Sequence, residues 1–466
     1  MQNNIRPYAL VRLCLLPMTM FASAPEHLRC EFLSEPLGLD CPAPHCSGQV
    51  ADTRTSARQI TYQVPLAAWA KQGAVPGLPD TTAWKHSVWI TSDVQVPMDD
   101  FTRSWQEAAL LDFASQKKAE PQELDAWYRH AHEDLATARS PVVFGKTFAL
   151  DKPVTAATLR ISGLGYFHAR INGVEAGDFA LAPNFTHYDA EARFLTLDVS
   201  KLLRAGENRI EVTVAHGRLR ELPGRMAKYI YRETPVLRAE LSITHPKGGV
   251  TKIGTDPSWQ AGFGPVRQAG FWVGEAYDAT AKPGGWQPAE VAKNFAPAMH
   301  ADDLPPQRIV RELDPVAVTQ PQPGVWVYDF GRMTAGKARV QVPPNASVTI
   351  RYANLLHGDI DKQKVRQISH SPFIVYPSGT DRENPGMIRP MYRCTCPVVI
   401  MRKGKPSLME WGYADCVRSV AAPLDYHATF DYTGYRYVEI TGLDKQLPVG
   451  AVKALEICND LPRTAG

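Results

Sequence analysis

Two groups of reactive side chains lie close enough together in the sequence to suggest chemistry. Cys30, Cys41 and Cys46 form a cluster near the N-terminus. No histidine or second cysteine pair stands at the spacing of a zinc site, so the cluster predicts a structural disulfide rather than a metal centre. The carboxylates Glu410 and Asp415 stand in "MEWGYADC". That stretch has no helical context, so we expect both to be solvated loop carboxylates.

Other catalytic motifs are not found. The sequence has no G-x-S-x-G nucleophile elbow, and its 13 histidines are scattered. P-loop and dinucleotide fingerprints do not occur either. The 51 lysines and arginines nearly balance the 48 aspartates and glutamates, and no basic block stands out. The charge pattern therefore gives no reason to expect a nucleic-acid partner.

The elements that must position any site read mostly as strands. The stretch "ATLRISGLGYFHARING" alternates apolar and polar side chains and then turns at Asn172-Gly173, a strong hairpin signal. Similar stretches follow at short spacing with Gly, Pro and Asn between them, which is typical of β-sandwiches. Residues 101–139 differ, because they are rich in Ala, Glu, Gln and Leu with helical spacing, and predict two helices broken near Pro121.

The N-terminus has the order of a secretory signal. Arg6 and Arg12 precede an apolar run from Leu13 to Phe21 and the small residues Ala22-Ser23-Ala24. This order predicts export to the periplasm or the extracellular space. The alternative is a mis-assigned start codon before a cytoplasmic protein. No stretch reaches the ~18 apolar residues of a membrane-spanning helix, so no membrane span is expected.

Several ordered segments resemble the bacterial α-L-rhamnosidase family of glycoside hydrolases. The ending "NDLPRTAG" is similar to the point where that family passes into its (α/α)6 catalytic barrel. Two positions depart from the family pattern: Gly48 stands in place of a tryptophan, and Thr433 in place of a histidine. The other matching segments are "LRCEFLSEPLGLDCPAPHCSGQV", "ISGLGYFHARINGVEAGDFALAPNFTHYD", "DPSWQAGFGPVRQAGFWVGEAYDATAKPGGW", "PVAVTQPQPGVWVYDFGRMTAGKARVQV" and "FDYTGYRYVEITG".

The resemblance implies a mostly β fold of tandem β-sandwiches. The first is a jelly roll of the galactose-binding type, the second is concanavalin-like, and a short helical insertion is added. The expected parts are a signal peptide at 1–24, a truncated fibronectin-like strand region at 25–80, the jelly-roll domain at 81–297 with its helical insertion at 101–139, the second sandwich at 305–460 with an insertion at 386–420, and the start of a linker at 461–466.

The resemblance also implies where catalysis would occur. Members of this family are inverting enzymes, and their general acid and base lie in the helical barrel. Inverting hydrolysis needs two carboxyl groups ~6.5–9.5 Å apart with a water between them. No long train of amphipathic helices is present in this sequence, so we assign it no catalytic residue and expect it to be inactive alone.

Carbohydrate binding is the stronger expectation, since the jelly roll forms a calcium-assisted rhamnose-binding module in some relatives. Calcium prefers carboxylate, amide and backbone oxygens. The competing interpretation is structural, with Asn172 in a turn, Asp178 at a strand end and the aromatic rings in the core. The candidate sugar contacts are Tyr166, Asn172, Asp178, Asn184 and Tyr188, with Phe185 as a further platform and Asp178 and Asp189 as the calcium ligands.

The sequence thus predicts the accessory, carbohydrate-binding part of an α-L-rhamnosidase-like hydrolase acting on rhamnose-containing glycans. One alternative is a component of an active rhamnosidase, with the barrel supplied by a separate polypeptide or lost by truncation. A second alternative is a structural adaptor without sugar affinity.

Overall fold

The computed structural model describes residues 84–109, 139–221, 229–270, 274–302, 304–353 and 414–459, together with short strands at 25–30, 46–50, 355–356, 376–377, 388–389, 398–402 and 405–408. The chain divides into two compact units, of which the first comprises Met1–Pro36 and Ala43–Ala74 and the second the remainder. The predicted signal peptide, the linker at 461–466 and Glu410 lie outside the described residues.

The first unit contributes one described strand pair. β1 (Pro25–Cys30) pairs antiparallel with β2 (Cys46–Val50), and Cys30 lies opposite Cys46 in the register. Cys41 and most of the predicted fibronectin-like region at 25–80 lie outside the described residues. The disulfide therefore stays a prediction.

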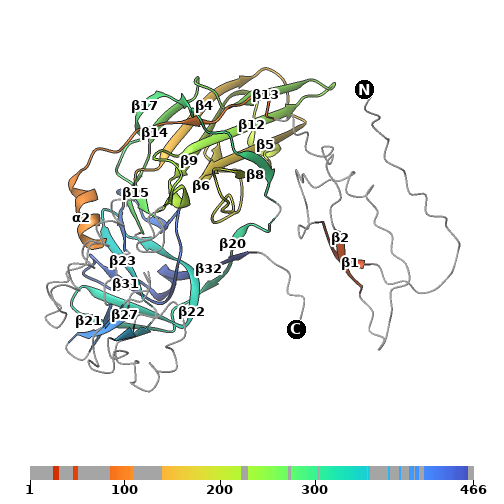
Figure 1. The fold of residues 1–466 in the computed structure, drawn as a ribbon. Helices are drawn as coiled ribbons and strands as arrows, with labels where there is room; N and C mark the ends of the chain where they lie inside the picture. Colours follow the sequence, from red (N-terminus) through yellow and green to blue (C-terminus); the bar gives the residue numbers. More distant parts are fainter. Residues whose placement is uncertain are drawn as a thin grey trace. The chain divides into compact units, whose positions relative to one another are not determined.

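The second unit begins with a two-layered β-sandwich (Figure 1). One layer is a seven-stranded sheet and the other a six-stranded sheet. The seven-stranded sheet consists of β18 (Glu290–Val291), β3 (Ile90–Thr91), β12 (Val236–Thr244), β5 (Ala156–Leu164), β8 (Glu191–Asp198) and β19 (Ala298–Ala301), with β13 (Val250–Gly254) beside β12. The six-stranded sheet consists of β17 (Gly284–Pro288), β14 (Gln260–Phe263), β4 (Val142–Leu150), β9 (Gly206–Ala215), β6 (Tyr166–Ile171) and β7 (Val174–Glu175).

Alternation along the strands produces the shared core between these sheets. In β9, Ile210, Val212 and Val214 are buried in the same apolar cluster as Phe144 and Leu241. Each such side chain contributes ~1.5–3 kcal/mol by leaving water. The intervening residues of β9 point to the outer face of the six-stranded sheet, because successive strand side chains alternate between faces.

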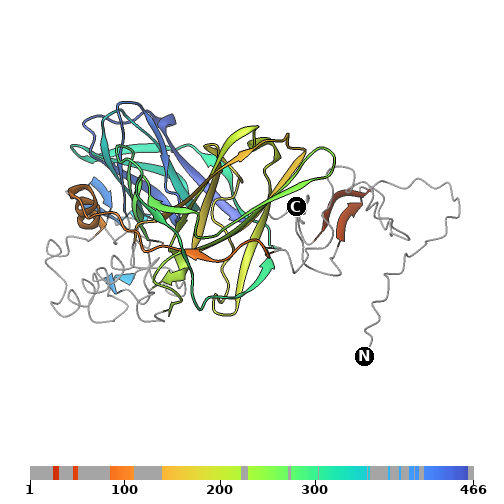
Figure 2. The same ribbon diagram turned by 90° about the horizontal axis from the view of Figure 1, so that it is seen from above.

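The second module is a single ten-stranded sheet. Its strands supply one common core that includes Tyr328, Ile350 and Ile440, so the sheet must curl around that core (Figure 2). Its strands are β15 (Val266–Gly270), β16 (Gly274–Asp278), β29 (Ala414–Arg418), β23 (Ser347–Ala353), β31 (Thr433–Thr441), β22 (Val325–Val342), β32 (Val452–Asn459) and β20 (Gln307–Leu313), with β21 (Ala317–Gln322) and β30 (Leu424–His427) paired to β22.

This sheet includes strands from outside the range predicted for the second sandwich. β15 and β16 come from the range assigned to the jelly roll, and β29 comes from the predicted insertion at 386–420. β16 and β29 run parallel, and Ala276 lies opposite Cys416. The mostly β class with a short helical insertion is confirmed, while residues 414–418 form an integral strand of the sheet.

One α-helix is present among the described residues, α2 (Asp100–Ala109), in the predicted helical segment. Asp99 caps it, because its Oδ1 accepts hydrogen bonds from the Thr102 N–H at 2.8 Å and from the Thr102 hydroxyl at 2.7 Å. The predicted second helix, after Pro121, lies outside the described residues. No helix in the described ranges is both long and apolar enough to cross a bilayer.

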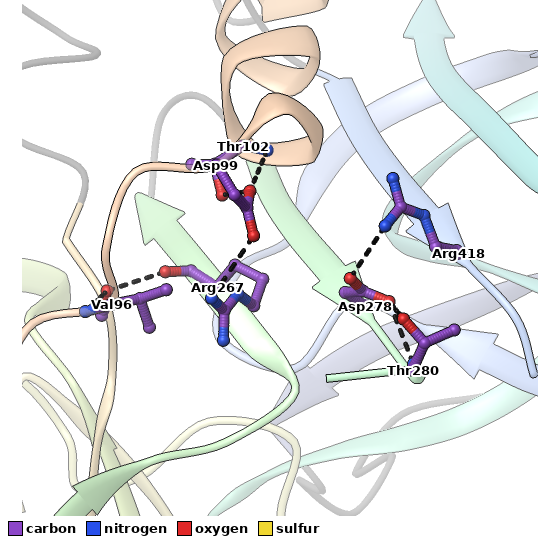
Figure 3. A network of polar contacts seen from close by, with 8 residues as sticks. Val96, Asp99, Thr102, Arg267, Asp278, Thr280 and Arg418 are labelled. Atoms are coloured by element: carbon purple, nitrogen blue, oxygen red, sulfur yellow. Dashed lines mark hydrogen bonds and ion pairs between the residues drawn. The ribbon is translucent and has the colours of Figure 1, made fainter. Parts of the chain in front are cut away.

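Charged side chains fasten α2 to the ten-stranded sheet (Figure 3). Arg267 on β15 lies 3.4 Å from Asp99, the helix cap. Arg418 on β29 lies 4.4 Å from the ring centroid of Phe101 and 3.2 Å from the carboxylate of Asp278 on β16. The helix is therefore tied to the same pair of parallel strands that carries the buried charges described below.

Candidate functional site

Three of the predicted sugar contacts have structural roles. Asn172 adopts a positive φ of 53° in the predicted hairpin turn. Its Nδ2 donates to Leu202 O at 2.8 Å and Asn208 Oδ1 at 2.9 Å, while its Oδ1 accepts the Arg209 N–H at 3.0 Å. Tyr166 and Tyr188 are buried in apolar clusters. Tyr166 and Tyr188 are closed to a ligand, and the side chain of half-buried Asn172 makes these hydrogen bonds, which agrees with the structural interpretation.

The two candidate calcium ligands are exposed. Asp178 forms an ion pair with Arg308, whose Nε lies 2.9 Å from the carboxylate. Within the described ranges, no group of three or more His, Cys, Asp and Glu residues is arranged to hold a metal ion. Any calcium site here would draw its other ligands from amide and main-chain oxygens.

An exposed aromatic group follows Asn184 in the loop between β7 and β8. The side chain of Phe185 is 48% exposed, and its ring packs edge-on against Tyr188 and Tyr231 with centroid distances of 5.3 and 6.4 Å. The Arg218 guanidinium carbon lies 5.4 Å from the centroid of Phe185. His187 packs edge-on against Tyr231 at 5.5 Å.

Hydrogen bonds fix this loop. The Asn184 N–H and Nδ2 both donate to the carboxylate of Asp302, at 2.8 and 2.9 Å. The Tyr231 N–H donates to Leu219 O at 3.0 Å. We call Asn184, Phe185, His187, Arg218 and Tyr231 the Phe185 patch. Tyr231 and Arg218 were not predicted from the sequence, because they reach the loop from separate segments.

The ten-stranded sheet contains a second polar group, which is closed to solvent. Glu275 and Asp415 are 0% exposed, and Asp431 and Lys337 are 1% exposed. We call these four residues the buried carboxyl cluster. Solvated loop placement was the prediction for Asp415, and it is wrong, because β29 carries this residue into the core between β16 and β23.

Hydrogen bonds satisfy the carboxyl groups of Glu275 and Asp415. Glu275 accepts the Tyr426 hydroxyl at 3.1 Å and the Thr429 N–H at 3.0 Å. Asp415 accepts the Glu275 N–H at 3.0 Å and the Tyr352 hydroxyl at 2.8 Å. These bonds connect β16, β29 and β23 with the loop before β31.

Burial changes the protonation of these groups. Loss of water, followed by repulsion from Asp431, raises the pKa of Glu275 to about 8. The same two causes hold the pKa of Asp415 well above its usual value. Burial lowers the pKa of Lys337, against the attraction of the surrounding carboxylates. The cluster can therefore retain protons at neutral pH, but a substrate cannot reach it.

Glu275→Gln is expected to flatten the pH dependence of stability. Folding raises the pKa of Glu275 from 4.5 to about 8, so its contribution is present below 4.5 and is lost as the pH rises through 8. Glutamine does not titrate; its Oε1 can accept the Thr429 N–H, and its Nε2 can donate to the oxygen of the Tyr426 hydroxyl. Wild type and variant should be equally stable near pH ~5, and the variant more stable near pH ~9.

Guanidinium denaturation across this pH range measures the difference. Glu290→Gln, which removes an exposed carboxylate from β18, is the control for a general change in charge. Parallel stability curves for wild type and Glu275→Gln would contradict the assigned role of Glu275.

Comparison with known proteins shows similarity to α-L-rhamnosidases. Residues 152–320 match the model of the α-L-rhamnosidase N-terminal domain. An α-L-rhamnosidase of Streptomyces avermitilis is 34% identical over 221 residues, which is 45% of this chain and 22% of that protein. Another, from Formosa agariphila, is 23% identical over 407 residues, which is 83% of this chain and 37% of that protein. Residues 152–320 are therefore similar to the α-L-rhamnosidase N-terminal domain, and the chain as a whole is similar to part of these enzymes.

Solved α-L-rhamnosidases share the fold. The structure from Dictyoglumus thermophilum matches 95% of this chain and 49% of its own with a TM-score of 0.65 at 20% identity. The Streptomyces avermitilis enzyme complexed with L-rhamnose matches 69% of this chain and 29% of its own with a TM-score of 0.56 at 26% identity. This chain therefore spans at most about half the length of these α-L-rhamnosidases.

The Phe185 patch and the buried carboxyl cluster differ in their position relative to the segment that matches the family model. Every residue of the Phe185 patch lies within the N-terminal domain at 152–320. The buried carboxyl cluster combines Glu275 from that range with Lys337, Asp415 and Asp431, which follow it. Of the two groups, the Phe185 patch is the candidate functional site, because its ring is open to solvent.

Proposed function

We propose that this chain is an accessory, carbohydrate-binding part of an α-L-rhamnosidase and that the Phe185 patch contacts rhamnose-containing glycans. The observation that carries the proposal is an exposed aromatic ring on a loop held by the Asn184–Asp302 hydrogen bonds. A loop that is already fixed loses little conformational freedom when a ligand binds.

The chemistry of the patch suits a deoxy sugar. The C–H face and methyl group of rhamnose are apolar and can pack on Phe185, whereas its hydroxyl groups need hydrogen-bond partners. Arg218, at 5.4 Å from the Phe185 ring, supplies donors beside it, and His187 adds ring nitrogens. The relative from Streptomyces avermitilis, solved with L-rhamnose, supports this choice of sugar.

Calcium is a separate part of the proposal. Asp178 would have to leave Arg308 to bind it, and Asp189 would need amide or main-chain oxygens to complete the ligand set. Sugar binding through the Phe185 patch does not depend on this ion. Titrations with added calcium and with a chelator therefore test the two parts independently.

Phe185→Ala is expected to weaken binding of methyl α-L-rhamnopyranoside about two- to tenfold, because loss of ring packing removes ~0.5–1.5 kcal/mol. Isothermal titration calorimetry measures the affinity. Val174→Ala on β7, which removes an exposed apolar side chain from the same sandwich, is the matched control and should bind like wild type. Equal affinity in Phe185→Ala and wild type would reject the site.

A further inference from the structure

A second exposed aromatic ring lies on the outer face of the six-stranded sheet. Trp286, on the edge strand β17, is 39% exposed. Beneath it are two glycines of neighbouring strands, Gly262 on β14 and Gly145 on β4. Arg209 and Glu211 reach the same face from β9, where Glu211 lies opposite Gly145.

The glycines let the ring lie close to the sheet. A Cβ atom at Gly262 would stand 2.8 Å from Trp286 Cε3, and one at Gly145 would stand 3.1 Å from Arg209 Nη2 and 3.7 Å from Trp286 Cζ3. A side chain at Gly262 would therefore displace the indole. A Cβ atom at Gly145 would be within contact distance of both the indole and the guanidinium, so the two groups cover adjacent parts of the sheet.

Charged groups flank the indole. The Arg209 guanidinium carbon lies 5.3 Å from its ring centroid, and Arg209 Nη2 lies 2.9 Å from the Glu211 carboxylate. Both charged side chains are partly exposed. An aromatic surface beside a donor and an acceptor complements a pyranose, which has one apolar C–H face and hydroxyl groups around its rim.

We propose that Trp286, Arg209 and Glu211, the Trp286 platform, form a second carbohydrate-binding surface. It takes a sugar unit within a glycan chain, because β17 is an edge strand and adjacent units can extend past it. The platform shares no residue with the Phe185 patch. The two proposals can therefore succeed or fail separately.

Nuclear magnetic resonance of the indole N–H groups tests the platform directly. The chain has 10 tryptophans, and Trp286→Phe identifies the signal of Trp286. We expect this signal to shift and saturate during titration with a rhamnogalacturonan oligosaccharide. Trp84, which has Arg238 at 5.2 Å from its ring, provides a matched tryptophan–arginine pair away from the platform. Its signal, identified with Trp84→Phe, should stay unchanged.

Affinities complete the test. Trp286→Ala should weaken oligosaccharide binding about tenfold, and Trp286→Phe should weaken it less. In Phe185→Ala, the Trp286 indole signal should still shift when the oligosaccharide is added. A shift of the Trp286 indole signal when the oligosaccharide is added to Phe185→Ala supports the platform even if the Phe185 patch binds nothing. A Trp286 signal that never shifts, or equal oligosaccharide affinity in Trp286→Ala and wild type, would overturn it.

Discussion

Lys337→Met is expected to lower the free energy of unfolding by about 3–5 kcal/mol at a pH above the pKa of Glu275, because the substitution removes the cation from a buried ionic group. Lys337 is 1% exposed and is attracted to Asp431, Glu275 and Asp415. Without it, ionised carboxylates would remain in a site without water. Methionine fills a similar volume, so lost charge rather than lost packing dominates the result.

The loss of unfolding free energy caused by Lys337→Met should depend on pH. The pKa of Glu275 is already raised to about 8, and removing the lysine raises it further, so more protons must stay bound for folding. At acidic pH those protons are available and the loss is smaller. As the pH rises, the unfolded chain releases protons that the folded variant must keep, so the loss grows.

Chemical denaturation at several pH values measures this dependence. Lys453→Met is the matched control, because Lys453 pairs with Asp314 at the surface and should contribute less than about 1 kcal/mol. In the Lys337→Met background, Glu275→Gln should recover part of the stability at high pH, which a double-mutant cycle quantifies. An equal loss at every pH, without coupling to Glu275, would show that Lys337 acts through packing alone.

Local features of the fold could be predicted from the sequence. The Asn172-Gly173 turn follows from two residues that tolerate positive φ, and they adopt φ values of 53° and 82°. The core of β9 follows from alternation of apolar and polar residues. The short helix follows from helical spacing after Asp99. Each signal is contained within a few residues.

Long-range pairing could not be predicted. Asp415 is buried because β29 pairs with β16, and its bond to the Glu275 N–H joins residues 140 positions apart. In the sequence, its surroundings resemble a polar loop. The site shows the same limit: Asn184 and Phe185 could be proposed from one segment, but Tyr231 and Arg218 join them only through the fold. Tyr188 could not be distinguished from an exposed ring, because aromatic residues beside turns occur in both settings.

Purified alone, the 466-residue chain is expected not to hydrolyse an aryl α-L-rhamnoside. Inverting hydrolysis requires two carboxyl groups ~6.5–9.5 Å apart on opposite sides of the sugar. The buried carboxyl cluster does gather carboxyl groups, but its members are at most 1% exposed and no sugar can reach them. Exposed Asp178 forms an ion pair with Arg308, and Asp302 accepts the hydrogen bonds of Asn184.

The family resemblance implies that the acid and base lie in a helical barrel, and the part of the chain that the structure describes contains one α-helix, of 10 residues. Losing a general acid alone costs a factor of about 10²–10⁴ in rate, and losing the base costs more. Release of the aryl group, followed by absorbance, measures the rate. We propose that a separate barrel polypeptide, co-expressed with this chain, restores turnover.

Variants then show whether this chain or the barrel polypeptide contains the catalytic residues. In the reconstituted pair, Glu275→Gln should leave the rate unchanged, because Glu275 cannot contact substrate. Phe185→Ala should change the rate on glycans more than the rate on the small aryl rhamnoside, since an accessory surface acts on parts of the substrate away from the reacting bond. Turnover by the chain alone, above that of a mock purification and abolished by Asp178→Asn or Asp189→Asn, would instead place the catalytic carboxylates on the first sandwich.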